Sequence, residues 1–120
     1  MMPPTQELVK SSWNQCRDWV KKLNHYYNRD VRLRSTAGRQ PVSEPYANPA
    51  LNRIFIPREA AFYDKRLIAH EYAHILTGEC PQGQWHNGKF EAYFREACLV
   101  LGVFPIPLWA LRKIVREAGK

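Results

Sequence analysis

The sequence predicts a single α+β domain in which a small mixed or antiparallel sheet packs on a central helix, with additional helices beside it. Its 120 residues suffice for one core of two layers but not for two independent cores. Hydrophobic residues make up 45% and charged residues 24% of the chain, which excludes disordered, fibrous and membrane classes. The order of periodic segments is helix, two short strands, helix, helix, helix. We therefore treat residues 1–120 as one domain.

The first predicted element is a helix over residues 5–27. Apolar residues recur there at steps of three and four, at Val9, Trp13, Cys16, Val20, Leu23 and Tyr27. This spacing forms one apolar stripe along a helix. Pro3 and Pro4 precede it, and Thr5 is suited to cap it. We expect the stripe to face the core, because a small domain needs its long helix to bury something.

Two short strands are predicted next. Residues 31–34 alternate Val and Leu with Arg, which is typical of an edge or half-exposed strand. Residues 51–56 form the second strand, which Pro57 ends. Residues 35–49 between them contain three prolines and several turn-forming residues. We expect a loop or an irregular crossing there.

Three helices are predicted in the second half of the chain. Residues 64–77 are strong helix formers, apolar on most of the circumference, and Gly78 follows as a C-cap. Such a helix belongs in the middle of the domain. The next helix carries one apolar face and stops at Gly102; that face consists of Phe90, Phe94, Ala97, Cys98 and Leu101. Pro107 can begin a last helix that carries Leu108, Leu111 and Val115.

The central helix contains the motif H-E-Y-A-H, formed by His70, Glu71 and His74. Histidines four residues apart lie one turn above each other, so both imidazoles can reach one cation. Glu71 lies one step round the helix, where a carboxylate can take a proton from a water that attacks a carbonyl and deliver it to the leaving amine. Three fixed positions match by accident in roughly one chain of this length in a few hundred. We therefore favour a metal site over two surface histidines.

A catalytic zinc site needs a third protein ligand and one open position. Two residues downstream qualify. His86 lies just before or at the start of the next predicted helix, and Glu91 lies on that helix. If both bound the metal, the site would be closed and structural, so the residues alone leave both alternatives open.

The HExxH motif followed by the segment W-H-N-G-K-F, residues 85–90, resembles the pattern of SprT-like zinc metallopeptidases. Their HExxH is followed by a third His in an H-G-x-x-F-type segment. The resemblance covers about residues 64–101. It implies a zincin-like fold, one Zn²⁺ per chain, and peptide hydrolysis by metal-activated water with Glu71 as general base. It also implies that His86 is the third ligand and that Phe90 packs the helix behind it.

The same resemblance implies that residues 51–56 are an edge strand beside the active-site helix, where an extended substrate adds as another strand. Two features depart from the SprT-like pattern. Asn87 stands where the family usually has Gly, and three cysteines without a CxxC pair cannot form the zinc ribbon that often follows. Compact gluzincin-like peptidases offer a rival alignment, in which the third ligand is Glu91 or, as a weaker candidate, Glu96.

The remaining candidates are weaker. Tyr46, Tyr63 and Tyr93 qualify only by type as groups that steady an oxyanion, and packing is the favoured interpretation of each. His25 has no partner at ligand spacing and is expected at the surface. Cys80 lies close to the motif in sequence, but a lone Cys in a turn is usually only a thiol.

Composition and charge favour a particular cellular location and class of binding partner. The chain has no apolar segment typical of a secretory signal or a membrane span, so we expect a cytoplasmic protein with reduced thiols and no membrane partner. Its net charge of +7 and pI near 9.6 favour acidic partners.

Besides a peptide or protein substrate, we consider DNA or a DNA-associated protein as a partner. If the two predicted strands pair, Arg32, Arg34 and Arg53 form a positive rim, and SprT-like enzymes include ones that act on proteins near DNA. No aromatic-interleaved nucleic-acid motif is present in the sequence. The alternative function is a non-catalytic zinc-containing regulatory or nucleic-acid-associated binding module.

Overall fold

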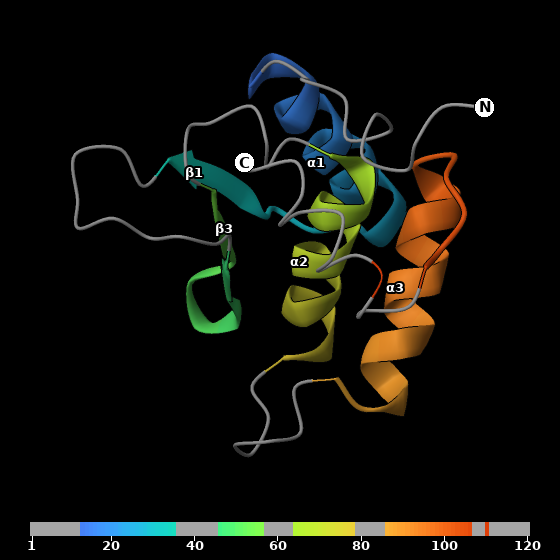
Figure 1. Cartoon of the computed structure of the whole chain (residues 1–120). Helices are drawn as coiled ribbons and strands as arrows, with labels where there is room; N and C mark the ends of the chain where they lie inside the picture. The colour runs from blue at the N-terminus through green and yellow to red at the C-terminus, as the bar shows by residue number, and fades with distance from the viewer. Residues whose placement is uncertain (1–12, 36–45, 57–63, 79–85, 107–109, 111–120) are drawn as a thin grey trace.

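The computed structural model describes residues 13–35, 46–56, 64–78, 86–106 and 110. The elements in order are α1 (Trp13–Tyr27), β1 (Arg32–Ser35), β2 (Tyr46–Asn48), the 3-10 turn η2 (Pro49–Leu51), β3 (Arg53–Ile56), α2 (Lys65–Thr77) and α3 (Gly88–Val100). Within these ranges the protein is an α+β fold with three α-helices and one mixed three-stranded sheet, which confirms the predicted α+β class. Helix α2 lies between the sheet and α3 (Figure 1).

The sheet has the order β1-β3-β2. Strand β1 runs parallel to β3, and β2 runs antiparallel to it. The prediction of residues 51–56 as an edge strand is therefore wrong, because β3 is central and the two edges of the described sheet are β1 and β2. The prediction of a loop or irregular crossing over residues 35–49 is wrong at Ser35, the last residue of β1, and at Tyr46–Asn48. Three residues between two prolines show no period-2 pattern, and prolines are tolerated at the ends of an edge strand.

One face of the sheet packs into the core. Ile54 and Ile56 of β3 are fully buried, and Leu33 of β1 and Ala47 of β2 pack against the same core. Because side chains alternate along a strand, the residues between them lie on the opposite, outer face. The alternation of residues 31–34 that predicted a half-exposed strand therefore holds in β1, although the strand begins one residue later.

Helix α1 places its predicted stripe in the core. Cys16, Val20 and Leu23 are buried, whereas His25 near its end is exposed as expected. Residues 5–12 of the predicted helix lie outside the described residues. After α1, Asn28 adopts a positive φ of 55°, a left-handed conformation that Asn accepts more readily than most residues. The chain then turns toward β1.

Helix α2 is central, as predicted. The Asp64 carboxylate caps its start by accepting a 2.8 Å hydrogen bond from the Arg66 backbone N–H. At its end the N–H of Gly78, whose φ is +82°, donates to the His74 carbonyl at 3.0 Å. This conformation favours glycine. Buried residues lie on nearly all sides of the helix, with Ile68, Ala69, Tyr72 and Ala73 fully inaccessible.

Helix α3 packs along α2. Its buried face contains Phe90, Phe94, Ala97 and Cys98, which confirms the predicted apolar face. The helix ends at Val100, and Gly102 follows with a φ of +79°, as expected for the residue that stops it. Of the helix predicted to begin at Pro107, only Ala110 lies within the described residues, and it is helical.

Two further expectations concern thiols and membranes. Cys16 and Cys98 are buried free thiols, and burial raises the pKa of each to about 12. Both thiols therefore stay protonated at neutral pH. Cys80 lies outside the described residues. Among the helices described, none has the length and apolar character that crossing a membrane requires.

Candidate metal centre

His70 and His74 lie on one face of α2, one turn apart, and their Nε2 atoms are 3.3 Å from each other. In a tetrahedral site with Zn–N bonds of about 2.0–2.1 Å, two ligand nitrogens stand about 3.3–3.4 Å apart. The observed separation therefore matches the distance between two ligand nitrogens of such a site, which is one edge of the coordination tetrahedron. The i, i+4 spacing on a helix capped at both ends holds this edge in place.

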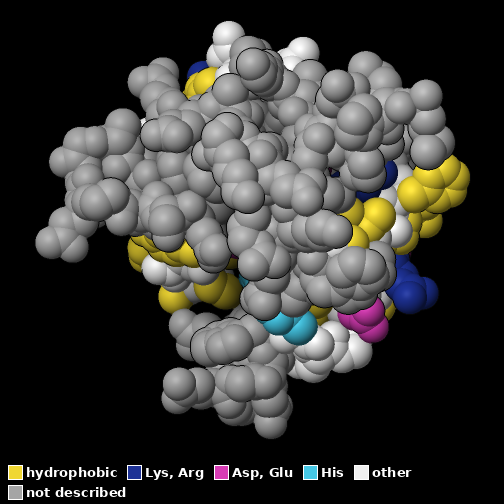
Figure 2. Space-filling view, viewed as in Figure 1, with side chains coloured by type: hydrophobic (Ala, Val, Ile, Leu, Met, Phe, Trp, Pro, Cys, Tyr) yellow, Lys and Arg dark blue, Asp and Glu magenta, His cyan; other side chains and the backbone are white. Residues whose placement is uncertain are grey.

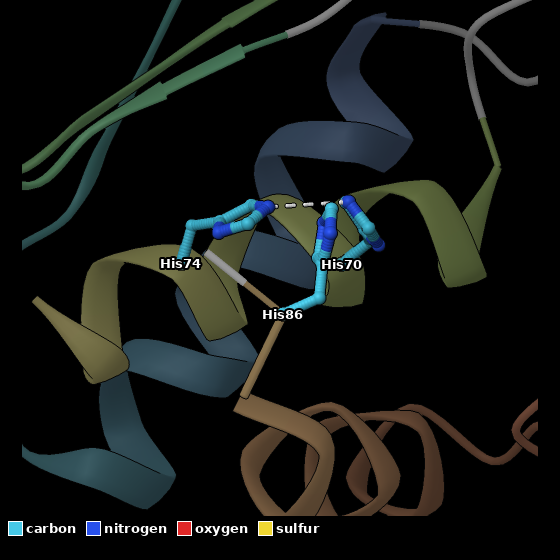
Figure 3. A group of neighbouring side chains, drawn as sticks. All are labelled: His70, His74 and His86. Carbon is cyan, nitrogen blue, oxygen red and sulfur yellow. Dashed lines mark hydrogen bonds between the residues drawn. The ribbon is translucent and has the colours of Figure 1, made fainter. Parts of the chain in front are cut away.

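His86 completes a group of three imidazoles. It lies two residues before α3, and its ring centroid is 5.2 Å from that of His70 and 5.0 Å from that of His74. Figure 3 shows the three rings turned toward one another. One ring nitrogen of each residue lies within 4.8 Å of the other two. Three imidazoles gathered in this way can hold one metal ion.

The start of α3 positions His86. The Asn87 side chain caps this helix by accepting a 2.9 Å hydrogen bond from the Phe90 N–H. Asn is among the best N-cap residues, and Gly is a weaker one. The departure from the SprT-like pattern at Asn87 therefore has a structural role, because the cap anchors the backbone next to His86.

Phe90 contacts all three histidines. Its ring centroid lies 5.0 Å from that of His70, 4.6 Å from that of His74 and 4.8 Å from that of His86. The side chain is 3% exposed. Its ring therefore forms an apolar wall that limits the rotation of the imidazoles without offering a competing hydrogen bond. The resemblance implied that Phe90 packs the helix behind His86, and the structure places its ring against all three imidazoles.

Sequence reasoning did not single out Phe94 for the site. Its ring centroid lies 5.9 Å from that of His70 and 6.1 Å from that of Phe90, with which it stacks. Phe94 follows Phe90 by one helical turn, so the i, i+4 spacing is the signal that places both rings on the side of α3 that faces the histidines.

Burial keeps His74 neutral. Removal from water, followed by the nearby charge of His86, lowers the pKa of His74 to about 4. The imidazole is therefore unprotonated at pH 7, and a ring nitrogen has a free lone pair. Metal binding needs this state, because a protonated imidazole cannot act as a ligand.

Glu71 lies beside the group without belonging to it. Its side chain is buried, and its Oε1 is 3.9 Å from Nε2 of His70. A carboxylate removed from water is costly unless a charge or a donor compensates it. A cation held by the histidines would be one such charge, so the position of Glu71 is compatible with a metal bound there.

Glu91 lies apart from the histidines. It is exposed in the first turn of α3, and so is Glu96 further along. Phe90 points toward the histidines at this position of the helix. The next residue, Glu91, lies about 100° around the helix axis from it. Among the described His, Cys, Asp and Glu residues, the group able to hold a metal is His70, His74 and His86. Of the two alternatives for the third ligand, the geometry favours His86.

The tyrosines proposed for an oxyanion lie elsewhere. Tyr93 packs edge-on against Tyr27 in the core periphery, at 6.3 Å between centroids, and Tyr46 stacks on Phe55 at 4.8 Å. Both contacts agree with the packing role that the sequence favoured. Tyr63 lies outside the described residues.

The histidine group fits a divalent transition metal. Three neutral imidazoles suit zinc, copper, iron or nickel, and three protein ligands leave one position of a tetrahedral site open. Figure 2 shows histidine side chains reaching the surface of the molecule. Comparisons of the chain with models of protein families, with curated proteins and with solved structures find no match.

Proposed function

We propose that this protein is a zinc-dependent metallopeptidase with a zincin-like arrangement. The observation that carries the proposal is the convergence of three imidazole nitrogens within 4.8 Å of one another, with the buried Glu71 carboxylate 3.9 Å from one of them. A lone HExxH motif lacks the third ligand that a catalytic site needs. The resemblance to SprT-like metallopeptidases, carried by the HEYAH and WHNGKF segments, agrees with this assignment.

Each residue has a distinct role in the proposed reaction. His70, His74 and His86 hold the metal. When bound, Zn²⁺ would act as a Lewis acid that lowers the pKa of water and polarises the scissile carbonyl. Glu71 accepts the proton of the attacking water and passes it to the amine that leaves. Phe90 excludes water from one side of the histidines.

The edge of the sheet supports a way to hold an extended substrate. Strand β2 (Tyr46–Asn48) is at the edge of the described sheet and contacts α2. Its outer backbone groups can pair with a peptide that adds as another strand. The resemblance assigned this role to residues 51–56; we transfer it to β2, because β3 already has a strand on each side.

Glu71→Gln tests the proposal. Glutamine keeps the shape of the side chain but cannot accept a proton, so we expect about one zinc per chain by elemental analysis and a loss of roughly 10²–10⁴-fold in the cleavage of a quenched fluorescent peptide library. Glu91→Gln makes the same chemical change outside the group and should keep both zinc and turnover.

The possible results separate catalysis from a structural or regulatory metal. Zinc that is retained without cleavage in the wild type would favour the non-catalytic zinc-containing module. An unchanged cleavage rate in Glu71→Gln would exclude Glu71 as general base. Absence of any bound metal in the wild type would exclude the whole proposal.

A further inference from the structure

The outer face of the sheet carries two rows of side chains that strand pairing brings into register. Arg34 of β1 pairs with Phe55 of β3, and Phe55 pairs with Tyr46 of β2. In the second row, Arg53 of β3 pairs with Arg32 on one side and Asn48 on the other. The rows on this face are Arg34–Phe55–Tyr46 and Arg32–Arg53–Asn48.

The first row contains an aromatic platform next to an arginine. The Tyr46 and Phe55 rings stack with centroids 4.8 Å apart and an interplanar angle of 14°. Tyr46 is 42% exposed and Phe55 is half-buried. Figure 2 shows hydrophobic side chains at the surface on the side of the molecule where the sheet lies. An exposed aromatic pair on a pleated surface offers a flat face for stacking.

The second row places two positive charges side by side. Arg32 and Arg53 are direct partners in the parallel register, and like charges opposite each other destabilise a sheet. Asp30 lies 3.6 Å from Arg32, but the two side chains are 80% and 62% exposed, so this pair stabilises little. An anionic ligand would relieve the repulsion between the arginines.

We propose that this outer sheet face, defined by Tyr46, Phe55, Arg32, Arg34 and Arg53, binds single-stranded nucleic acid. Unpaired bases stack on exposed aromatic rings while arginines neutralise the phosphates. Proteins that bind single-stranded nucleic acid on a sheet surface combine these two kinds of contact. A duplex hides its base faces and would leave the aromatic row unused. An acidic peptide would meet the arginines only. The net charge of +7 agrees with a polyanionic partner.

The sequence lacks an aromatic-interleaved motif because the platform comes from three separate segments. Tyr46, Phe55 and Arg34 belong to different strands and become neighbours only when the sheet forms. The inference does not depend on the metallopeptidase proposal, because the outer face is opposite the face that packs into the core. Its test therefore needs no metal and no cleavage.

The test measures fluorescence anisotropy of a labelled oligothymidine of about 12 nucleotides with the full chain at several salt concentrations. We expect Tyr46→Ala to weaken binding roughly 5–100-fold, since stacking on one aromatic ring supports one base. Tyr46→Phe should retain binding because it keeps the ring. Arg34→Gln and Arg53→Gln should each weaken binding and reduce the salt slope by about 1.

Matched controls lie on α1. Arg17→Gln removes the same charge and Tyr26→Ala the same ring from exposed positions off the sheet, and both should bind like the wild type. Thermal melting checks that each variant is folded. The Glu71→Gln variant should bind normally, which separates this result from any failure of the catalytic proposal.

Three results would overturn the inference. The first is an equal loss in Arg17→Gln and Arg34→Gln, which would indicate diffuse charge. The second is displacement of the oligothymidine by duplex DNA or polyglutamate at equal charge concentration, with no effect of Tyr46→Ala, which would indicate a duplex or an acidic protein as partner. The third is the absence of binding at low salt.

Discussion

The Tyr72 hydroxyl donates a 2.8 Å hydrogen bond to Oδ1 of Asn24 and so joins the HExxH helix to the end of α1. The same Oδ1 accepts the Val31 N–H at 3.0 Å, and the Asn24 amide donates to the Val31 carbonyl at 2.9 Å. One side chain therefore connects α1, the start of β1 and α2. Tyr72 lies between the two motif histidines, so this connection fixes the helix that carries them.

Removal of Asn24 should destabilise the fold more than removal of the tyrosine hydroxyl. Tyr72→Phe breaks one hydrogen bond but leaves Asn24 paired with Val31, which costs about 1 kcal/mol. Asn24→Ala breaks all three and leaves a partly buried N–H, a carbonyl and a hydroxyl without their protein partner, which costs roughly 2–4 kcal/mol. Urea unfolding of the two variants measures the difference. Equal losses would show that the Val31 bonds contribute nothing.

His86, rather than Glu91, should determine metal affinity. Elemental analysis and titration with a zinc indicator should show tight binding in the wild type and in Glu91→Ala. His86→Ala should lose most of the affinity for zinc, because only two histidine ligands remain. Zinc at 100 times its Kd should stabilise the wild type by about 2.7 kcal/mol and should leave the melting temperature of His86→Ala nearly unchanged. A metal lost with Glu91 but kept without His86 would place the third ligand on α3.

The sequence predicts the helices better than the sheet, for physical reasons. The stripes of α1 and α3 and the caps of α2 are local signals, since a residue and its neighbours three or four positions away decide them. Strand β2 lacks such a signal: three residues between Pro45 and Pro49 become a strand because β3 pairs with them. The central position of β3 likewise depends on residues distant in sequence.

The candidate site likewise has one part that local spacing predicts and another part that depends on tertiary structure. The spacing of His70 and His74 is sufficient to place two ligands one turn apart. The choice between His86 and Glu91 needs the rotation of α3 about its axis, which the burial of Phe90 determines. Sequence reasoning also left the arginine rim conditional on strand pairing, and the parallel register of Arg32 with Arg53 now supplies that pairing.

Phe90 should act as a positioning residue for the metal site. Phe90→Ala would remove a buried ring that touches three imidazoles and should cost roughly 3–5 kcal/mol of stability. Phe90→Leu keeps most of the volume, so the protein should stay folded while the rings gain freedom. We expect weaker zinc binding in Phe90→Leu than in Phe94→Leu, a matched change one turn further along, as measured by competition with a zinc chelator. Equal affinities in the two variants would contradict a positioning role.

Acid should destabilise the metal-free protein through His74. Its pKa is lowered to about 4 in the folded state, whereas an unfolded histidine has a pKa of about 6.5. Above pH 6.5 His74 is neutral in both the folded and the unfolded state, so its titration does not change the free energy of unfolding. As the pH falls from about 6.5 toward 4, His74 becomes protonated in the unfolded state but stays neutral in the folded state. The free energy of unfolding therefore decreases. Urea unfolding in the presence of a chelator measures this decrease, and His74→Gln should lose less stability than wild type across the same window. An identical pH dependence in the two proteins would show that another group is responsible.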